Sequence, residues 1–327
     1  MRQKKVLVLL LAAICATLLA GCQGCNTVDK PETPPVAVTR LDTLLFEPGG
    51  VDSLLEHHAD FATLWGNVLG YDGREPLPQL FGRFASDTLM RQLYDSINRV
   101  FPTTEAQVSQ LQEAFGAIAA HLPQMTIPHI YFYNSGFNAS ILLADSMLGI
   151  GLDRFLGPGC WYYSQLGIPR YLARSMAPQR IAPVALQMWV ESEYPLDVSR
   201  TKILDHMLYR GALLYMVRQA LQGLPDSVAL GYSGQQLLWL QEHERALWQY
   251  LSEKKLLYET NSLLVNQFTK PAPFTTALGQ DSPGQAACYV GYRIVEAYMH
   301  RNPTAPWSDL LGAQSAQTIL GGARYNP

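Results

Sequence analysis

One short segment, ILDHMLYRGALLYMV at residues 203–217, carries a histidine and an arginine one helical turn apart. In a zinc peptidase helix, the motif His-Glu-x-x-His supplies two imidazole ligands and a glutamate that acts as the general base. Here Met207 follows His206, and Arg210 occupies the position of the second histidine. A guanidinium stays protonated and has no lone pair to offer to zinc. The spacing therefore predicts a helix with at most one metal ligand, no catalytic residue and no bound metal.

A second candidate site is the glycine-punctuated segment GPGCWYYSQLG at residues 157–167, which holds Trp161, Tyr162 and Tyr163. Amphipathic aromatic side chains on loops are typical of recognition surfaces, so we expect this loop to contact a partner. A loop folded over the core would have the same composition, and that alternative stays open. Just upstream, Asp153 is expected either to line a groove at a sheet edge or to cap a helix.

The elements that must position these residues are mostly helical. Residues with helical spacing of apolar side chains occupy the ranges 51–68, 104–121, 178–194, 199–221, 234–254 and 283–301. Two helix starts carry a Ser-x-x-Gln capping box, Ser233 with Gln236 and Ser282 with Gln285. Three strands are predicted within residues 126–157. The pattern predicts an α+β fold, mostly helical with a small antiparallel or mixed sheet.

The N-terminus has the order of an exported lipoprotein. Arg2, Lys4 and Lys5 precede an apolar run at residues 6–18, and Leu-Ala-Gly-Cys follows, ending at Cys22. The run is too short for a transmembrane span, and the ending resembles a bacterial lipobox. We therefore expect a covalent diacylglycerol and an N-acyl chain on Cys22, and no other cofactor. The predicted organisation is a signal peptide at 1–21, a proline-rich tether at 22–37 and one domain at 38–327.

The charge balance excludes one class of partner. Residues 1–21 hold three basic and no acidic residues, which leaves 21 basic against 27 acidic residues and a net charge of −6. Without a basic patch, nucleic-acid binding is not expected. The predicted partner is a lipid bilayer, reached through the anchor at Cys22. Gln23 follows Cys22 where an inner-membrane retention aspartate would often be, which favours the outer membrane. No acidic run directly follows Cys22, as it often does in surface-exposed lipoproteins, which favours a periplasm-facing domain. Cys160 and Cys288 remain in the body of the chain, either as a disulfide or as two separate thiols.

Several long segments occur in an order that is similar to the GldB-type gliding motility lipoproteins of Bacteroidota. These segments are LGIGLDRFLG at 148–157, MWVESEYP at 188–195, the helix at 203–217, and the stretches 224–260, 274–299 and 316–327. The resemblance extends from about residue 38 to residue 327 and implies a lipoprotein associated with gliding and type IX secretion, without an established enzymatic activity. One departure is Ala212, which lies where relatives often carry a lysine.

The same order of elements also resembles a degenerate zincin-like peptidase. This resemblance implies His206 as a first ligand and Glu242 or Glu244 as a third, with the 283–301 helix packed closely behind them. Because Arg210 replaces the second histidine, we expect its guanidinium either to pair with Glu242 or Glu244 in place of a metal or to be solvated at the surface. The four residues would then form a degenerate site or groove.

Three functions fit these observations. The first is a non-catalytic lipoprotein that supports an envelope machine by contacting other envelope or secretion proteins. The second is a zinc-dependent peptidase or cell-wall hydrolase with an atypical ligand set. The third is a periplasmic module that binds peptide or glycan in a retained groove. Metal content separates the second from the others, and recovery of binding partners separates the first from the third.

Overall fold

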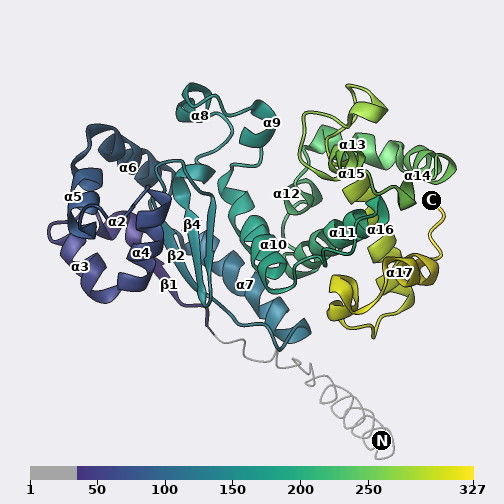
Figure 1. Cartoon of the computed structure of the whole chain (residues 1–327), viewed down its shortest axis with the longest axis horizontal. Coiled ribbons are helices and arrows are strands. Elements are labelled where there is room, and N and C mark those ends of the chain that lie inside the picture. Colours follow the sequence, from purple (N-terminus) through teal and green to yellow (C-terminus); the bar gives the residue numbers. More distant parts are fainter. Residues whose placement is uncertain (1–34) are drawn as a thin grey trace, which may run out of the picture. The chain divides into compact units, whose positions relative to one another are not determined.

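The computed structural model describes residues 35–327, and in it four strands form one mixed sheet in the order β1-β2-β4-β3 (Figure 1). Strand β1 pairs parallel with β2, β2 pairs parallel with β4, and β3 joins β4 as an antiparallel hairpin. The strands are β1 (Val38–Arg40), β2 (His129–Tyr133), β3 (Ile141–Ala144) and β4 (Met147–Gly151). The α+β prediction is confirmed. Strand β1 was not predicted, because three residues are too few to show an alternating pattern.

Helices make up most of the remaining described chain. The α-helices are α2 (Leu41–Leu44), α3 (Gly50–His57), α4 (Ala59–Val68), α5 (Leu77–Ser86), α6 (Thr88–Val100), α7 (Glu105–His121), α8 (Trp161–Gln165), α9 (Arg170–Ala173), α10 (Ile181–Glu193), α11 (Ile203–Ala220), α12 (Asp226–Leu230), α13 (Gly234–Glu242), α14 (Glu244–Glu253), α15 (Ser262–Thr269), α16 (Ala286–Arg301) and α17 (Ala316–Ala323). Short 3-10 turns are η1 (Leu152–Phe155), η2 (Pro178–Arg180), η3 (Leu256–Tyr258) and η4 (Thr276–Leu278), and η5 (Asp309–Ala313) is a π-helical turn.

Two predicted helices are each divided at a histidine. The range 51–68 contains α3 and α4, which are separated at His58, where φ is −137° and ψ is 37°. The range 234–254 contains α13 and α14, separated at His243. In both cases the apolar periodicity continues across the break, so the pattern alone cannot locate it. The ring of His58 lies edge-on to Tyr131 of β2, at 5.8 Å between centroids, which fixes the turn against the sheet.

The two predicted capping boxes have different outcomes. At α13 the prediction is confirmed, since Ser233 Oγ accepts from the Gln236 backbone N–H and the Gln236 side chain accepts from the Ser233 N–H. At α16 it is wrong. Gln285 has a left-handed φ of 51°, and the Ser282 hydroxyl bonds to carbonyls of the preceding loop instead. The predicted start at residue 283 therefore moves to Ala286.

Strand β2 separates the two large clusters of buried side chains. Its residues Ile130 and Phe132 belong to the cluster shared with α7 and α10, whereas Tyr131 and Tyr133 belong to the cluster shared with α3, α4 and α5. This alternation follows from the two-residue period of a strand. Figure 1 shows the corresponding layers, with α3–α5 on one face of the sheet and α7 and α10 on the other.

The two longest helices of the C-terminal half, α11 and α16, meet backbone to backbone. A Cβ added at Gly291 would lie 1.8 Å from the carbonyl oxygen of Met207, and one added at Gly211 would lie 2.2 Å from the carbonyl carbon of Gly291. Only glycine permits an approach this close. The prediction that the 283–301 helix packs closely behind the 203–217 segment is confirmed, and this contact holds α11 in place beside the candidate site.

Candidate functional site

Arg210 of α11 forms a two-pronged ion pair with Glu191 of α10. Its Nη1 donates to Glu191 Oε2 at 2.9 Å, and its Nη2 donates to Oε1 at 3.0 Å. Helices α10 and α11 pack against each other, which brings the two side chains together. The predicted pairing of Arg210 with Glu242 or Glu244 is wrong. Glu191, Glu242 and Glu244 all lie on helices that could pack beside α11. Only the arrangement of the helices in the folded protein decides which of them meets Arg210.

Glu244, at the start of α14, instead holds the C-terminal end of the chain. It accepts hydrogen bonds from Arg293 Nε of α16 at 3.0 Å and from the Tyr325 hydroxyl at 2.7 Å. The Tyr289 hydroxyl donates to its other oxygen at 3.4 Å. Glu242 is exposed at the end of α13. The structure therefore gives Arg210 and Glu244 separate partners on different helices and does not join them in one site.

His206 is half-buried near the beginning of α11. Burial lowers the pKa of its imidazole, and the positive charges of Lys270 and Arg210 lower it further, against the opposing effect of Asp205. These charges favour a neutral ring and disfavour a cation beside it. Among residues 35–327, no three histidine, cysteine, aspartate or glutamate side chains lie together in the way that a metal site requires.

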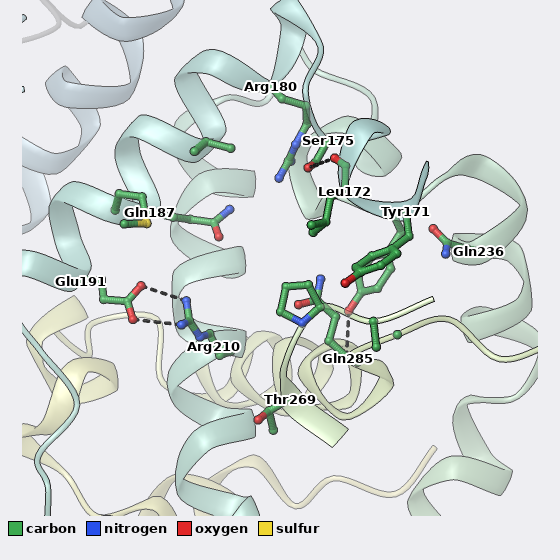
Figure 2. Close-up of a pocket in the computed structure, with 17 residues that line it drawn as sticks. Tyr171, Leu172, Ser175, Arg180, Gln187, Glu191, Arg210, Gln236, Thr269 and Gln285 are labelled. Carbon is green, nitrogen blue, oxygen red and sulfur yellow. Dashed lines mark hydrogen bonds and ion pairs between the residues drawn. The ribbon is translucent and has the colours of Figure 1, made fainter. Parts of the chain in front are cut away.

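A cavity of about 460 Å³ opens beside the Arg210–Glu191 pair. One wall is made by Arg180 at the end of η2 and by one face of α10, which presents Val184, Gln187, Met188 and Glu191. Figure 2 shows Arg180 and Gln187 directed into the same space, with Tyr171 and Gln236 across from them. The remaining wall comes from the segments that precede α13 and α16 and follow α15. The volume lies in the range of about 300–1,000 Å³ that is typical of small-molecule sites.

Arg180 lies where this cavity meets a second one of about 240 Å³. Its Nη1 donates to the carbonyl oxygens of Val228 and Ala229 at the end of α12, the second at 3.2 Å. Gly231 follows with φ of 78°, and a Cβ there would lie 2.7 Å from Arg180 Nη2. Burial lowers the pKa of the guanidinium to about 10. Arg180 Nε has no hydrogen-bond partner.

Gln187 is the second unsatisfied donor of the cavity wall. Its Nε2 is shielded from solvent and has no hydrogen-bond partner. Two hydroxyls of the wall are satisfied: the Tyr232 hydroxyl donates to the Gln285 carbonyl at 3.2 Å, and Ser175 Oγ donates to the Leu172 carbonyl at 2.7 Å. Sequence reasoning missed both Arg180 and Gln187. Their spacing on one helix face was visible, but nothing local indicated that this face borders a cavity.

The family model described as "Gliding motility protein GldB" matches residues 25–327. The chain belongs to the GldB family. The resemblance identified from the sequence is thereby confirmed. No curated protein and no solved structure gave a significant match.

The aromatic segment of this GldB-family chain is a short helix, α8, and not a loop. Trp161 is 64 % exposed, Tyr162 is partly buried against Phe137, and Tyr163 is buried. The Tyr163 hydroxyl donates to the Asp153 carbonyl and accepts from the Leu156 N–H, both at 2.9 Å. The three predicted contact residues are therefore split: Trp161 faces solvent, and Tyr163 anchors α8. A role of this segment in partner contact stays a prediction.

Asp153 neither lines a groove nor caps a helix in this GldB-family structure. Its fully buried carboxylate closes the turn after β2 by accepting from Ser135 N–H at 2.8 Å, Ser135 Oγ at 2.7 Å and Phe137 N–H at 2.6 Å. Burial raises its pKa, against the effect of these three donors. Cys160 and Cys288 are separate thiols.

Two predictions concern the membrane. Cys22, the signal segment at 1–21 and most of the tether at 22–37 lie outside the described residues. Within residues 35–327, no helix combines the length and the apolar character needed to cross a bilayer.

Proposed function

We propose that this GldB-family protein is a lipid-anchored, periplasm-facing envelope protein that supports gliding motility or type IX secretion-type machinery without catalysing a reaction. Family membership supports the association with gliding motility. The order of basic, apolar and Leu-Ala-Gly-Cys residues at the N-terminus supports an anchor at Cys22. Gln23 favours the outer membrane over the inner membrane.

The observation that carries the non-catalytic part is the ion pair between Arg210 and Glu191. Glu191 is the only acidic residue among the lining residues of the cavity, and both of its oxygens accept hydrogen bonds from Arg210. A general base needs a carboxylate oxygen that is free to take a proton from water or substrate. A metal ion at Glu191 would have to share the carboxylate with a guanidinium, which repels a cation. The cavity is thus better suited to holding a ligand than to hydrolysing one.

A candidate surface for partner binding is formed by α8 and the residue that follows it. Trp161 is 64 % exposed and Leu166 is 54 % exposed. The Tyr163 hydroxyl ties the backbone beneath them to η1, so the helix is held rigidly. A rigid, exposed tryptophan is the kind of side chain that dominates binding energy at protein interfaces, where its removal typically costs about 2 kcal/mol or more.

The test is chemical cross-linking in intact membranes, followed by recovery of the full-length protein and identification of its neighbours. The wild-type chain and Trp161→Ala are compared, with Leu263→Ala on α15 as the control, because Leu263 is also apolar and 78 % exposed. We expect Trp161→Ala to lose neighbours whose own deletion impairs gliding or secretion, and Leu263→Ala to retain them. The melting temperature of Trp161→Ala should stay near that of the wild type.

Two outcomes would contradict the proposal. One is recovery of the same neighbours from Trp161→Ala and from the wild type. The other is a peptide-hydrolysing or cell-wall-hydrolysing activity of the purified chain that disappears with Glu191→Gln.

A further inference from the structure

The cavity beside α10 carries one uncompensated positive charge. Its charged lining residues are Arg180, Glu191 and Arg210, and the last two neutralise each other as a close pair. None of the ion pairs found in residues 35–327 involves Arg180. The adjoining smaller cavity adds Arg174 and contains no acidic lining residue. Both cavities therefore favour an anion at the place where they meet.

Arg180 has hydrogen-bonding capacity left for such an anion. A guanidinium has five N–H donors in a planar fork. Nη1 is used by the carbonyl oxygens of Val228 and Ala229, while Nε has no partner. Nε and Nη2 share one edge of the fork, and this edge matches the two oxygens of a carboxylate. The two carbonyls orient the guanidinium but do not remove its net charge.

Gln187 supplies a further donor on the same wall. It lies seven residues after Arg180, or about two turns along the helix, and its Nε2 has no partner. A buried donor without a partner destabilises the fold, and a charged one does so more strongly. An acceptor that entered the cavity would relieve this cost at both positions. Both residues line the cavity (Figure 2), so we expect the Gln187 amide to turn toward such an acceptor, while the two carbonyls hold Arg180 in place at the cavity wall.

We propose that this cavity binds the free α-carboxylate of a short peptide, held by Arg180 and Gln187. Within the cavity beside α10, Arg180 is the one uncompensated charge, because Arg174 lines only the adjoining cavity; this fits a carboxylate monoanion better than a phosphate dianion. The remaining wall offers what a peptide backbone and small side chains need, namely the side-chain amide of Gln285, the Nε2 group of Gln236 (its Oε1 accepts from the Ser233 N–H), and apolar surface at Leu172, Val184 and Met188. The inference goes beyond the proposed support of an envelope machine, because it assigns a small ligand to a cavity that the proposed partner-binding surface on α8 does not line.

The test uses the full-length protein in detergent and isothermal titration calorimetry. Three probes are compared: N-acetyl-trialanine with a free carboxylate, the same peptide as its C-terminal amide, and glucuronate as a sugar acid. We expect the free acid to bind at least about tenfold more tightly than the amide, which corresponds to about 1.4 kcal/mol. Glucuronate should bind more weakly than the free acid. Equal binding of acid and amide, or no binding of either, would overturn the proposal. Tighter binding of glucuronate would overturn the choice of a peptide.

Two variants locate the site. Gln187→Glu replaces the donor by a carboxylate that competes with the ligand for Arg180, so affinity for the free acid should fall at least about tenfold. Gln92→Glu introduces the same change on the exposed face of α6 and should leave the affinity unchanged. Arg180→Met tests the guanidinium directly, but it also removes the contacts to α12. Gln187→Glu keeps the proposal open to refutation if Arg180→Met does not fold. Undiminished affinity in Gln187→Glu would place the carboxylate elsewhere.

This test is independent of the partner experiment. Loss of neighbours in Trp161→Ala concerns α8, whereas carboxylate binding concerns a cavity that Trp161 does not line. The protein can therefore fail either test while passing the other.

Discussion

Arg210 and Glu191 join α11 to α10 through two parallel hydrogen bonds, and each side chain is only 30 % exposed. Two bonds in one plane fix the orientation of both side chains as well as their distance. Because the pair is shielded on most sides, removing one member leaves the other poorly solvated. The pair therefore stabilises the packing of α11 against α10. It also engages Glu191, the only carboxylate among the residues that line the cavity.

Replacing Arg210 by alanine should lower the free energy of unfolding by roughly 1–2 kcal/mol, between the values for exposed and buried pairs. Urea denaturation measures this change. Arg245→Ala, at an exposed position of α14, is the control and should change stability by less than about 0.5 kcal/mol. In a double-mutant cycle with Glu191→Ala, we expect a coupling energy clearly above zero. Strictly additive effects would mean that the pair contributes nothing.

Gly291→Ala should strongly destabilise the protein, because the new Cβ would lie 1.8 Å from the Met207 carbonyl oxygen of α11. Backbone cannot move aside as a side chain can, so we expect a cost of about 3 kcal/mol, at the upper end for overpacked cores. Gly82→Ala in α5 is the matched control. A Cβ at Gly82 meets nothing within 4 Å, so this change should stabilise by about 0.5–1 kcal/mol through helix propensity. Similar melting temperatures for both variants would contradict the close approach of α11 and α16.

His206 should make the protein less stable in mild acid. Burial, followed by the charges of Lys270 and Arg210, lowers its pKa from the usual 6.5, so the folded state holds a proton less readily than the unfolded state. The contribution of neutral His206 to the free energy of unfolding is therefore fully present above pH 6.5, and it is lost as the pH falls through the lower pKa of the folded state. Unfolding free energies at about pH 7.5 and about pH 5 should differ less in His206→Gln than in the wild type. The exposed His57→Gln is the control, and an unchanged pH dependence in His206→Gln would refute the prediction.

Cys22→Ser should abolish lipidation, because the serine hydroxyl is not an acceptor for the diacylglyceryl group. Without acyl chains the protein loses the predicted lipid anchor, so it should appear in the soluble fraction after cleavage or accumulate as the unprocessed precursor. Fractionation and immunoblotting measure both outcomes. Cys25→Ser, three residues further along, is the matched control and should remain membrane-bound. A Cys22→Ser protein that stays in the membrane at the mature size would show that the anchor lies elsewhere.

Protein purified without chelator or affinity metal should contain far less than one zinc per chain. The physical reason is the positive surroundings of His206, since Arg210 and Lys270 disfavour a bound cation. Elemental analysis of the wild type and of His206→Ala gives the answer. Near-stoichiometric zinc that disappears with His206→Ala would support the peptidase alternative instead.

Local chemistry explains what the sequence by itself determined. The capping box at Ser233, the amphipathic spacing in α7 and α10, and the strand pattern of β2 each depend on residues within a few positions of one another. Hydrogen bonds and apolar faces at that range repeat with the period of the element, so they can be read directly. The order of long segments also identified the family, because it is a property of the chain and not of its packing.

Only the tertiary structure decided which groups meet across the chain. Arg210 could have paired with Glu191, Glu242 or Glu244, and a charge does not specify its partner until helix packing sets the distances. The cavity with Arg180 and Gln187 is built from α9, α10 and α11 together with residues near the start of α13, the end of α15 and the start of α16, which are far apart in sequence. Unsatisfied donors are likewise invisible in a sequence, because every polar group has a partner in water until folding removes that water.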